Sequence, residues 1–317
     1  MEKGKYWVVP ANNAQDKKSC AKISVRFPSQ KLFSQTIMDY TQTINKLSRW
    51  FDDYAHSFEC GPQQLHEAAL LKHEHTRQVC CNMDSLCKSI SLGNPLLFTA
   101  QITALFHDVG RFLQYKDHNT FQDRKSVNHS QLGLKVIDEY HLLDDLPQDL
   151  SHKIRTAILY HSARTIPDNL AKDQDLLCRL IRDADKLDIY SIVASHYSNP
   201  SQVRKEIFET GLPDLPTVTP QICSAVASGS TVDFSMIKCL NDFKLIQVGW
   251  VYDLNFTRSF QLLKERGHFE QITAQLPLIP EVIHAIELAR RYLEKCASQR
   301  FTAYSIYSEA PEGVPRL

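Results

Sequence analysis

The chain has 317 residues, of which 43% are hydrophobic and 23% charged, and 36 lysine and arginine residues balance 36 aspartate and glutamate residues. This composition is typical of a globular protein and excludes a disordered or collagen-like chain. The formal net charge of zero argues against binding of nucleic-acid polymers or anionic membranes through a basic surface. No segment approaches the ~20 consecutive apolar residues of a membrane span.

The nine cysteines point to a reducing compartment. Their number is odd, and none of them forms a Cys-x-x-Cys pair. Scattered cysteines in a chain of this length are typical of reduced thiols, and the first residues lack the apolar core of a signal peptide. We therefore expect a cytoplasmic protein. The sequence is compatible with an oligomer.

After Pro28 the hydrophobic pattern becomes helical. It predicts helices over 31–56, 64–91 and 96–109, the last one stopped by Gly110, and then a loop over 112–127. Further helical segments are predicted over 128–143, 149–163, 173–197, 236–266 and 281–300, with an irregular connection over 211–233 that holds one short helix.

The pattern predicts an all-α protein. Residues 1–30 are expected to be an irregular N-terminal segment and residues 31–200 a compact helical core. Residues 201–317 are expected to form a C-terminal helical extension packed on that core.

Four of the thirteen histidines fall on apolar helix faces. They are His75, His107, His129 and His161, and Asp108 directly follows the second of them. A single histidine on such a face is more often a hydrogen-bonded core residue than a ligand. Four on separate helices are costly to bury without a partner, and a divalent metal pairs well with imidazoles and carboxylates together.

The predicted helix over 173–197 carries the string Arg-Asp-Ala-Asp-Lys-Leu-Asp at residues 182–188. Asp188 lies within its apolar stripe, while Asp183 and Asp185 lie on the two flanks of that stripe. At least one of these carboxylates must enter the core. Periodicity leaves open whether Asp183 or Asp185 binds a metal.

These residues resemble the H…HD…D signature of the HD-domain metal-dependent phosphohydrolases. The similar strings are His-Thr-Arg-Gln-Val at 75–79, Ala-Leu-Phe-His-Asp-Val-Gly-Arg at 104–111, His-Ser-Gln-Leu-Gly at 129–133, Leu-Tyr-His at 159–161 and Ala-Asp-Lys-Leu at 184–187. The resemblance covers residues 64–197. Beyond it, Asp-Leu-Asn-Phe at 253–256 is loosely similar to bacterial HD proteins.

The resemblance implies an HD-type helical bundle that holds one or two divalent ions of Mn, Fe, Co, Ni, Zn or Mg. The implied metal ligands are His75, His107, Asp108, His129, His161 and Asp185, with Asp188 a buried structural carboxylate. Asp108 would bridge the two ions, and a water that the ions activate would attack a phosphate ester. The implied substrate is a small phosphorylated molecule such as a nucleotide.

The resemblance also suggests basic residues for catalysis and phosphate binding. Lys186 and Arg111 are candidates for catalysis beside Asp108, and Arg111, Arg124, Lys125 and Arg164 are candidates for phosphate contacts; ordinary surface charge explains each of these four equally well. Ser162 stands where binuclear relatives often have a second histidine, and no Gly-Tyr-Pro element of cyclic-di-GMP enzymes is present. Two alternatives are a metal-binding sensor or interaction protein without turnover and an HD-type di-iron oxygenase.

Overall fold

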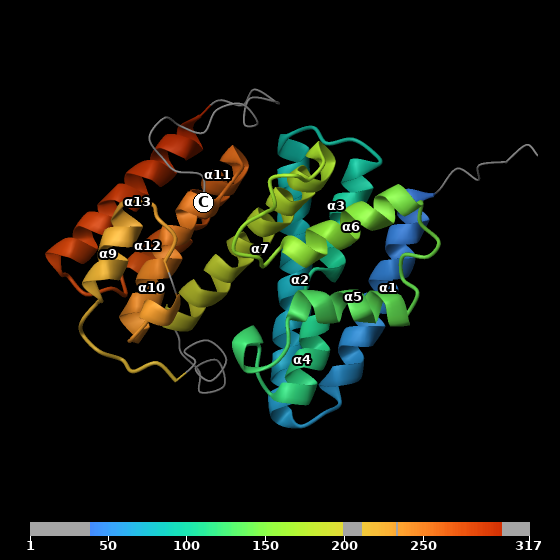
Figure 1. Cartoon of the computed structure of the whole chain (residues 1–317), viewed down its shortest axis with the longest axis horizontal. Helices are drawn as coiled ribbons and strands as arrows, with labels where there is room; N and C mark the ends of the chain where they lie inside the picture. The colour runs from blue at the N-terminus through green and yellow to red at the C-terminus, as the bar shows by residue number, and fades with distance from the viewer. Residues whose placement is uncertain (1–38, 199–210, 233, 300–317) are drawn as a thin grey trace, which may run out of the picture. The chain divides into compact units, whose positions relative to one another are not determined.

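The protein is built from α-helices, as a computed structural model shows (Figure 1). The structure describes residues 39–198, 211–232 and 234–299, and no strand occurs among them. The predicted segment 1–30 and the first residues of the predicted helix 31–56 lie outside this described part. The all-α prediction is confirmed.

The helices of the first half follow the predicted order, with one additional helix between the third and the fourth predicted ones. They are α1 (Tyr40–Glu59), α2 (Gln63–Ser89), α3 (Leu96–Phe106), α4 (Gly110–His118), α5 (His129–Glu139), α6 (Gln148–Tyr160) and α7 (Lys172–Ser198), with the short 3-10 helix η1 (Asp123–Lys125) before α5. Local sequence explains several ends: the side chains of Asp39 and Asn128 accept backbone N–H groups in the first turns of α1 and α5.

The second half contains shorter helices. They are α9 (Pro220–Ala227), η2 (Phe234–Met236), α10 (Leu240–Gly249), η3 (Trp250–Asp253), α11 (Thr257–Arg266), α12 (His268–Thr273) and α13 (Pro280–Ser298). Proline begins both α9 and α13, a position where its missing N–H costs no hydrogen bond. The short helix expected within 211–233 is therefore α9.

The predicted loop over 112–127 is wrong in its first half, because residues 110–118 form α4. The helical pattern was hidden because the polar side chain of Gln114 is fully buried on the inner face. Its amide donates to Asp123 and to the Val127 carbonyl at 2.9 and 3.0 Å. Gly110 also does not stop α3, which ends at Phe106; it is the first residue of α4.

The predicted helical segment over 236–266 is interrupted between α10 and α11. Residues Leu254 and Phe256 adopt extended backbone conformations there. The break lets backbone N–H groups of this stretch point at α7, where the Asp183 carboxylate accepts them at 2.9–3.0 Å. A tertiary hydrogen-bonding partner therefore explains an interruption that helical periodicity does not reveal.

Helix α7 links the two halves of the described structure. It packs against α2, α3 and α6 and also against α11 and α12 (Figure 1). Its apolar stripe, including Leu177, Ile181 and Ala184, is fully buried. All described residues belong to one compact unit that begins at Asp39, so the predicted boundary at residue 200 stays a prediction.

A search of the described helices finds none that is both long enough and apolar enough to span a bilayer. The eight cysteines in the described part of the chain are all free thiols.

Candidate metal centre

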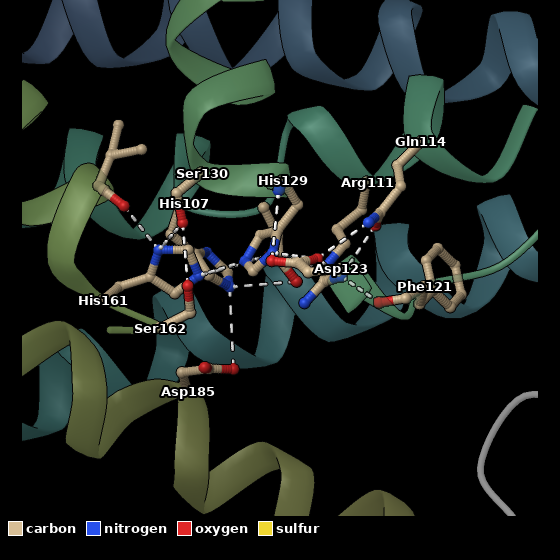
Figure 2. Close-up of polar contacts among 12 residues, drawn as sticks. His107, Arg111, Gln114, Phe121, Asp123, His129, Ser130, His161, Ser162 and Asp185 are labelled. Atoms are coloured by element: carbon tan, nitrogen blue, oxygen red, sulfur yellow. Dashed lines mark hydrogen bonds and ion pairs between the residues drawn. The ribbon is translucent and has the colours of Figure 1, made fainter. Parts of the chain in front are cut away.

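The structure brings the six predicted ligands together. His75 comes from α2, His107 and Asp108 from the turn after α3, His129 from the start of α5, His161 from the end of α6 and Asp185 from α7. Figure 2 shows the rings of His107, His129 and His161 close together, with Asp185 approaching from α7. The four histidines and Asp108 are at most 3% exposed.

Each of the four histidines is held through its Nδ1 atom by an acceptor outside the cluster. Carboxylates hold two of them: Asp188 lies 2.7 Å from Nδ1 of His75, and Asp123 lies 2.7 Å from Nδ1 of His129. Backbone carbonyls hold the others at 2.8 Å for His107 and 2.7 Å for His161. Because these acceptors require an N–H donor, the proton of each neutral ring lies on Nδ1.

The Nε2 atoms therefore face the interior of the cluster as acceptors. Nε2 of His75 lies 3.2 Å from Nε2 of His107, and Nε2 of His129 lies 3.1 Å from Nε2 of His161. Two unprotonated nitrogens at such distances repel each other unless a cation or a proton lies between them. This arrangement of outer acceptors and inner lone pairs is typical of histidine metal ligands.

Asp108 lies between the two histidine pairs. Its Oδ2 is 3.5 Å from Nε2 of His75, and its Oδ1 is 3.4 and 3.5 Å from Nε2 of His129 and His161. Asp185 Oδ1 lies 3.2 Å from Nε2 of His75. Both Asp108 Oδ1 and Asp185 Oδ1 are buried and accept no hydrogen bond from the described residues. The donor set and these two oxygens, which accept no hydrogen bond, fit one or two divalent ions.

Two cations hold the Asp108 carboxylate in place. Lys72 Nζ lies 2.7 Å from Oδ2, and Arg111 Nε lies 3.4 Å from Oδ1. Lys72 was not expected from the sequence, because it precedes the resemblance to the first-histidine string and has no recognisable pattern. Although burial raises the pKa of Asp108, the positive charges of Lys72 and Arg111 hold it well below its usual value.

The histidines differ in their affinity for protons. Burial lowers the pKa of His107 to about 3 and that of His129 to about 4, so both are neutral at pH 7. Burial also lowers the pKa of His75, but the carboxylates of Asp108, Asp185 and Asp188 outweigh it and raise the value to about 10. The carboxylate-rich surroundings of His75 thus favour a positive charge, which a proton or a metal ion supplies.

We expect metal uptake to release a proton from His75. Without an ion the imidazole is protonated at pH 7, since its pKa is about 10, and a metal must displace the proton from Nε2. The apparent affinity should rise by about tenfold per pH unit between pH 6 and 9. Titration calorimetry in two buffers of different ionisation enthalpy measures the released proton; no release would contradict a ligand role for His75.

The carboxylate of Asp183 lies elsewhere. It is fully buried and accepts from the backbone N–H groups of Asn255 and Phe256 and from the Ser259 hydroxyl, the last at 2.6 Å. Asp183 thus binds the backbone just before α11, whereas Asp185 contacts the histidines. The sequence left open whether Asp183 or Asp185 belongs to the histidine cluster. The structure places Asp185 there and Asp183 outside it.

Lys186 is paired rather than free. Its Nζ lies 2.7 Å from Asp253 Oδ2, which also accepts from Arg182 at 2.8 Å. The Asp-Leu-Asn-Phe string at 253–256 thus supplies partners for Arg182, Asp183 and Lys186 of α7. Lys186 lies next to Asp185 in the chain and shares the Asp253 carboxylate with Arg182.

The predicted phosphate-binding residues fall into two groups. Arg111 is engaged, because its Nη1 donates to the Phe121 carbonyl, to Gln114 and to Asp123, the last two at 2.8 and 3.0 Å (Figure 2). Arg124, Lys125 and Arg164 are exposed, and the Arg124 guanidinium lies 5.5 Å from the Phe234 ring centroid. The structure does not bring these three into the cluster.

A cavity of about 480 Å³ lies beside the His75–Asp188 pair. Its walls come from α2, α7 and the α11–α12 region, with Glu74, Ser191, Arg266 and His268 among them. None of the other five predicted ligands lines it. The cavity therefore reaches the outer side of His75 rather than the interior of the cluster.

A family model described as HD domain matches residues 73–190. The chain contains an HD domain. The matched segment includes all six predicted ligands and Asp188, while Lys72 and the Asp253–Phe256 stretch lie outside it. No curated protein and no solved structure matches the chain significantly.

Asp123 is a residue of the HD domain that sequence patterns did not reveal. Its two oxygens lie 2.9 and 2.7 Å from Nδ1 of His129. Replacement of Asp123 by alanine should weaken metal binding by about 10- to 100-fold, because the ring of His129 loses the acceptor that fixes its orientation. Metal titration of the purified variant measures the change.

Asp117 on α4 provides the matched control, since it is an exposed aspartate. Asp117→Ala should bind metal as the wild type does. Equal affinities for the Asp123 and Asp117 variants would show that His129 does not depend on its carboxylate partner.

Proposed function

We propose that this protein is a metal-dependent phosphohydrolase that cleaves a phosphate ester in a small, nucleotide-like substrate. The observation that carries the proposal is the convergence of four Nε2 atoms on the buried Asp108 within a matched HD domain. His75, His107, Asp108 and Asp185 would hold one divalent ion, and Asp108, His129 and His161 a second.

Divalent ions at these positions would supply an activated water and neutralise the charge on phosphoryl oxygens. The protein would contribute a rigid, dry frame. Asp123 and Asp188 orient two of the imidazoles, and Lys72 and Arg111 fix both oxygens of Asp108. We assign Arg111 a positioning role, because its Nη1 already donates to three protein acceptors and its Nε lies 3.4 Å from Asp108 Oδ1.

Exposed basic residues would contact the substrate phosphate. Arg124 and Lys125 follow Asp123, and Arg164 lies three residues after His161, so each is on a segment that carries part of the centre. A net charge of zero favours a small nucleotide over a nucleic-acid polymer. Free cysteines throughout the described part of the chain support our proposal of a reducing, cytoplasmic location.

A metal-depletion experiment tests the proposal. The full-length protein is stripped with a chelator and reloaded separately with Mn, Fe, Co, Ni, Zn or Mg, since mixed nitrogen and oxygen ligands suit several of these ions. We expect no turnover of nucleotides or model phosphodiesters before reloading, and phosphate or monoester release afterwards. We also expect a higher melting temperature with metal, because the ion binds the folded state.

The outcomes separate three classes of protein. Metal-dependent release of phosphate or monoester supports the hydrolase. Bound metal without turnover across the substrates would contradict it and favour a sensor. Oxygen consumption with an iron-loaded sample would instead favour an oxygenase.

A further inference from the structure

A second group of metal-ligating side chains lies between α1 and α2. It consists of His56 and Glu59 on α1 and His73 on α2, and their potential ligand atoms all lie within 4.8 Å of one another. His73 faces α1, whereas His75, two residues later, contacts Asp188 on α7. We call these three residues the outer cluster.

The orientation of His73 resembles that of the histidines in the buried centre. Its Nε2 lies 2.8 Å from Asp52 Oδ1, so the proton of the neutral ring lies on Nε2 and the Nδ1 lone pair is free. Asp52 is held in turn by the Arg77 guanidinium. A carboxylate behind the ring fixes the tautomer and the ring position, as it does for His129.

The free Nδ1 of His73 faces Glu59. Nδ1 lies 3.5 Å from Glu59 Oε1, and Nε2 of His56 lies 3.9 Å from the same oxygen. Glu59 Oε1 is buried and has no hydrogen-bond partner among the described residues. The Nδ1 lone pair of His73, Nε2 of His56 and a carboxylate oxygen of Glu59 therefore meet without a hydrogen bond among them, an arrangement that a cation bound to all three would stabilise.

The ligand types indicate the class of cation. Two imidazole nitrogens and one carboxylate oxygen suit zinc and similar first-row ions better than calcium or magnesium. The side chain of His56 is 59% exposed, whereas those of Glu59 and His73 are 17% and 15% exposed. The cluster is thus open on the His56 side, where solvent can complete a four-coordinate site.

We propose that His56, Glu59 and His73 form an additional binding site for a zinc-like divalent cation, separate from the HD centre. The ion would join α1 to α2 near the loop that connects them. The bound ion would exchange readily with ions in solution, because one ligand is exposed and one coordination position is open.

Zinc and cobalt binding by the metal-depleted full-length protein tests this site. We compare the wild type with His56→Ala, Glu59→Gln and the control His141→Ala, which removes a histidine that is likewise exposed and paired with a carboxylate. After equilibrium dialysis, elemental analysis should count one more ion in the wild type and the control than in the other two variants. Occupancy of the site should require at least tenfold more zinc in His56→Ala.

The comparison separates this site from the HD centre. Failure of the HD centre to bind metal would lower all four counts equally and leave the difference between variants intact. Equal counts and affinities in the wild type, His56→Ala and Glu59→Gln would overturn the outer site. Loss in His56→Ala with full binding in Glu59→Gln would overturn it as well, because the shared carboxylate oxygen would then not be a ligand. Circular dichroism confirms that each variant is folded.

Discussion

For the proposed phosphohydrolase activity, replacement of Asp108 by asparagine should lower the rate of metal-dependent phosphate release by about a thousandfold. Asp108 lies between both pairs of histidines, and its Oδ1 is buried without a hydrogen bond. An amide has the same shape but no negative charge, so it would hold a divalent ion much less tightly than the carboxylate would. Steady-state rates and bound-metal counts on the same samples check the prediction.

Asp138→Asn is the matched control, because Asp138 is an exposed aspartate near the end of α5 whose partner is Arg155. It should retain full activity and metal content. A folded Asp108→Asn protein with normal turnover would contradict the ligand role proposed for Asp108. The amide oxygen can still accept from Lys72, so we expect this variant to fold.

Alanine at Gly110 should lower the free energy of unfolding by about 3 kcal/mol. A Cβ atom there would lie 2.4 Å from the His129 carbonyl oxygen and 2.5 Å from the Gly133 backbone nitrogen. Both are main-chain atoms and cannot rotate away. Helices α4 and α5 would have to separate, and the separation would also move the ligand His129. Chemical denaturation of the variant and the wild type measures the loss.

Gly133→Ala is the control, because Gly133 on α5 faces Gly110 across the contact between α4 and α5. Its Cβ would meet the Gly110 backbone nitrogen at 3.4 Å and a Val109 methyl at 3.5 Å, which are ordinary contacts. Because alanine favours a helix interior over glycine by about 1 kcal/mol, this variant should be as stable as the wild type or more stable. A similar loss at both positions would argue against a backbone clash specific to Gly110.

The helical periodicity predicted most of the fold and the positions of the histidines. His75, His107, His129 and His161 lie on faces whose other members are apolar, so the pattern alone placed them in the core. It could not choose between Asp183 and Asp185, since both lie on flanks of the same apolar stripe. Only the resemblance to the family string indicated Asp185, which the structure places beside His75.

The residues that sequence analysis missed act through long-range contacts. Lys72 and Asp123 reach Asp108 and His129 from segments without a distinctive pattern. Gln114 is fully buried because three acceptors surround its amide nitrogen, and a buried polar residue weakens the apolar period by which α4 could have been recognised. Tertiary hydrogen bonds, which leave no local signal, explain each of these cases.

The carboxylate of Asp183 also bears on how independent the HD domain is. The family match ends at residue 190, yet the partners of Asp183 are Asn255, Phe256 and Ser259. A fragment cut at the end of the match would leave the buried Asp183 carboxylate without these partners and without the cover of α11. The segment that the family model matches and the compact unit of the structure therefore have different boundaries, and Asp183, two residues before Asp185, forms hydrogen bonds across the end of the match.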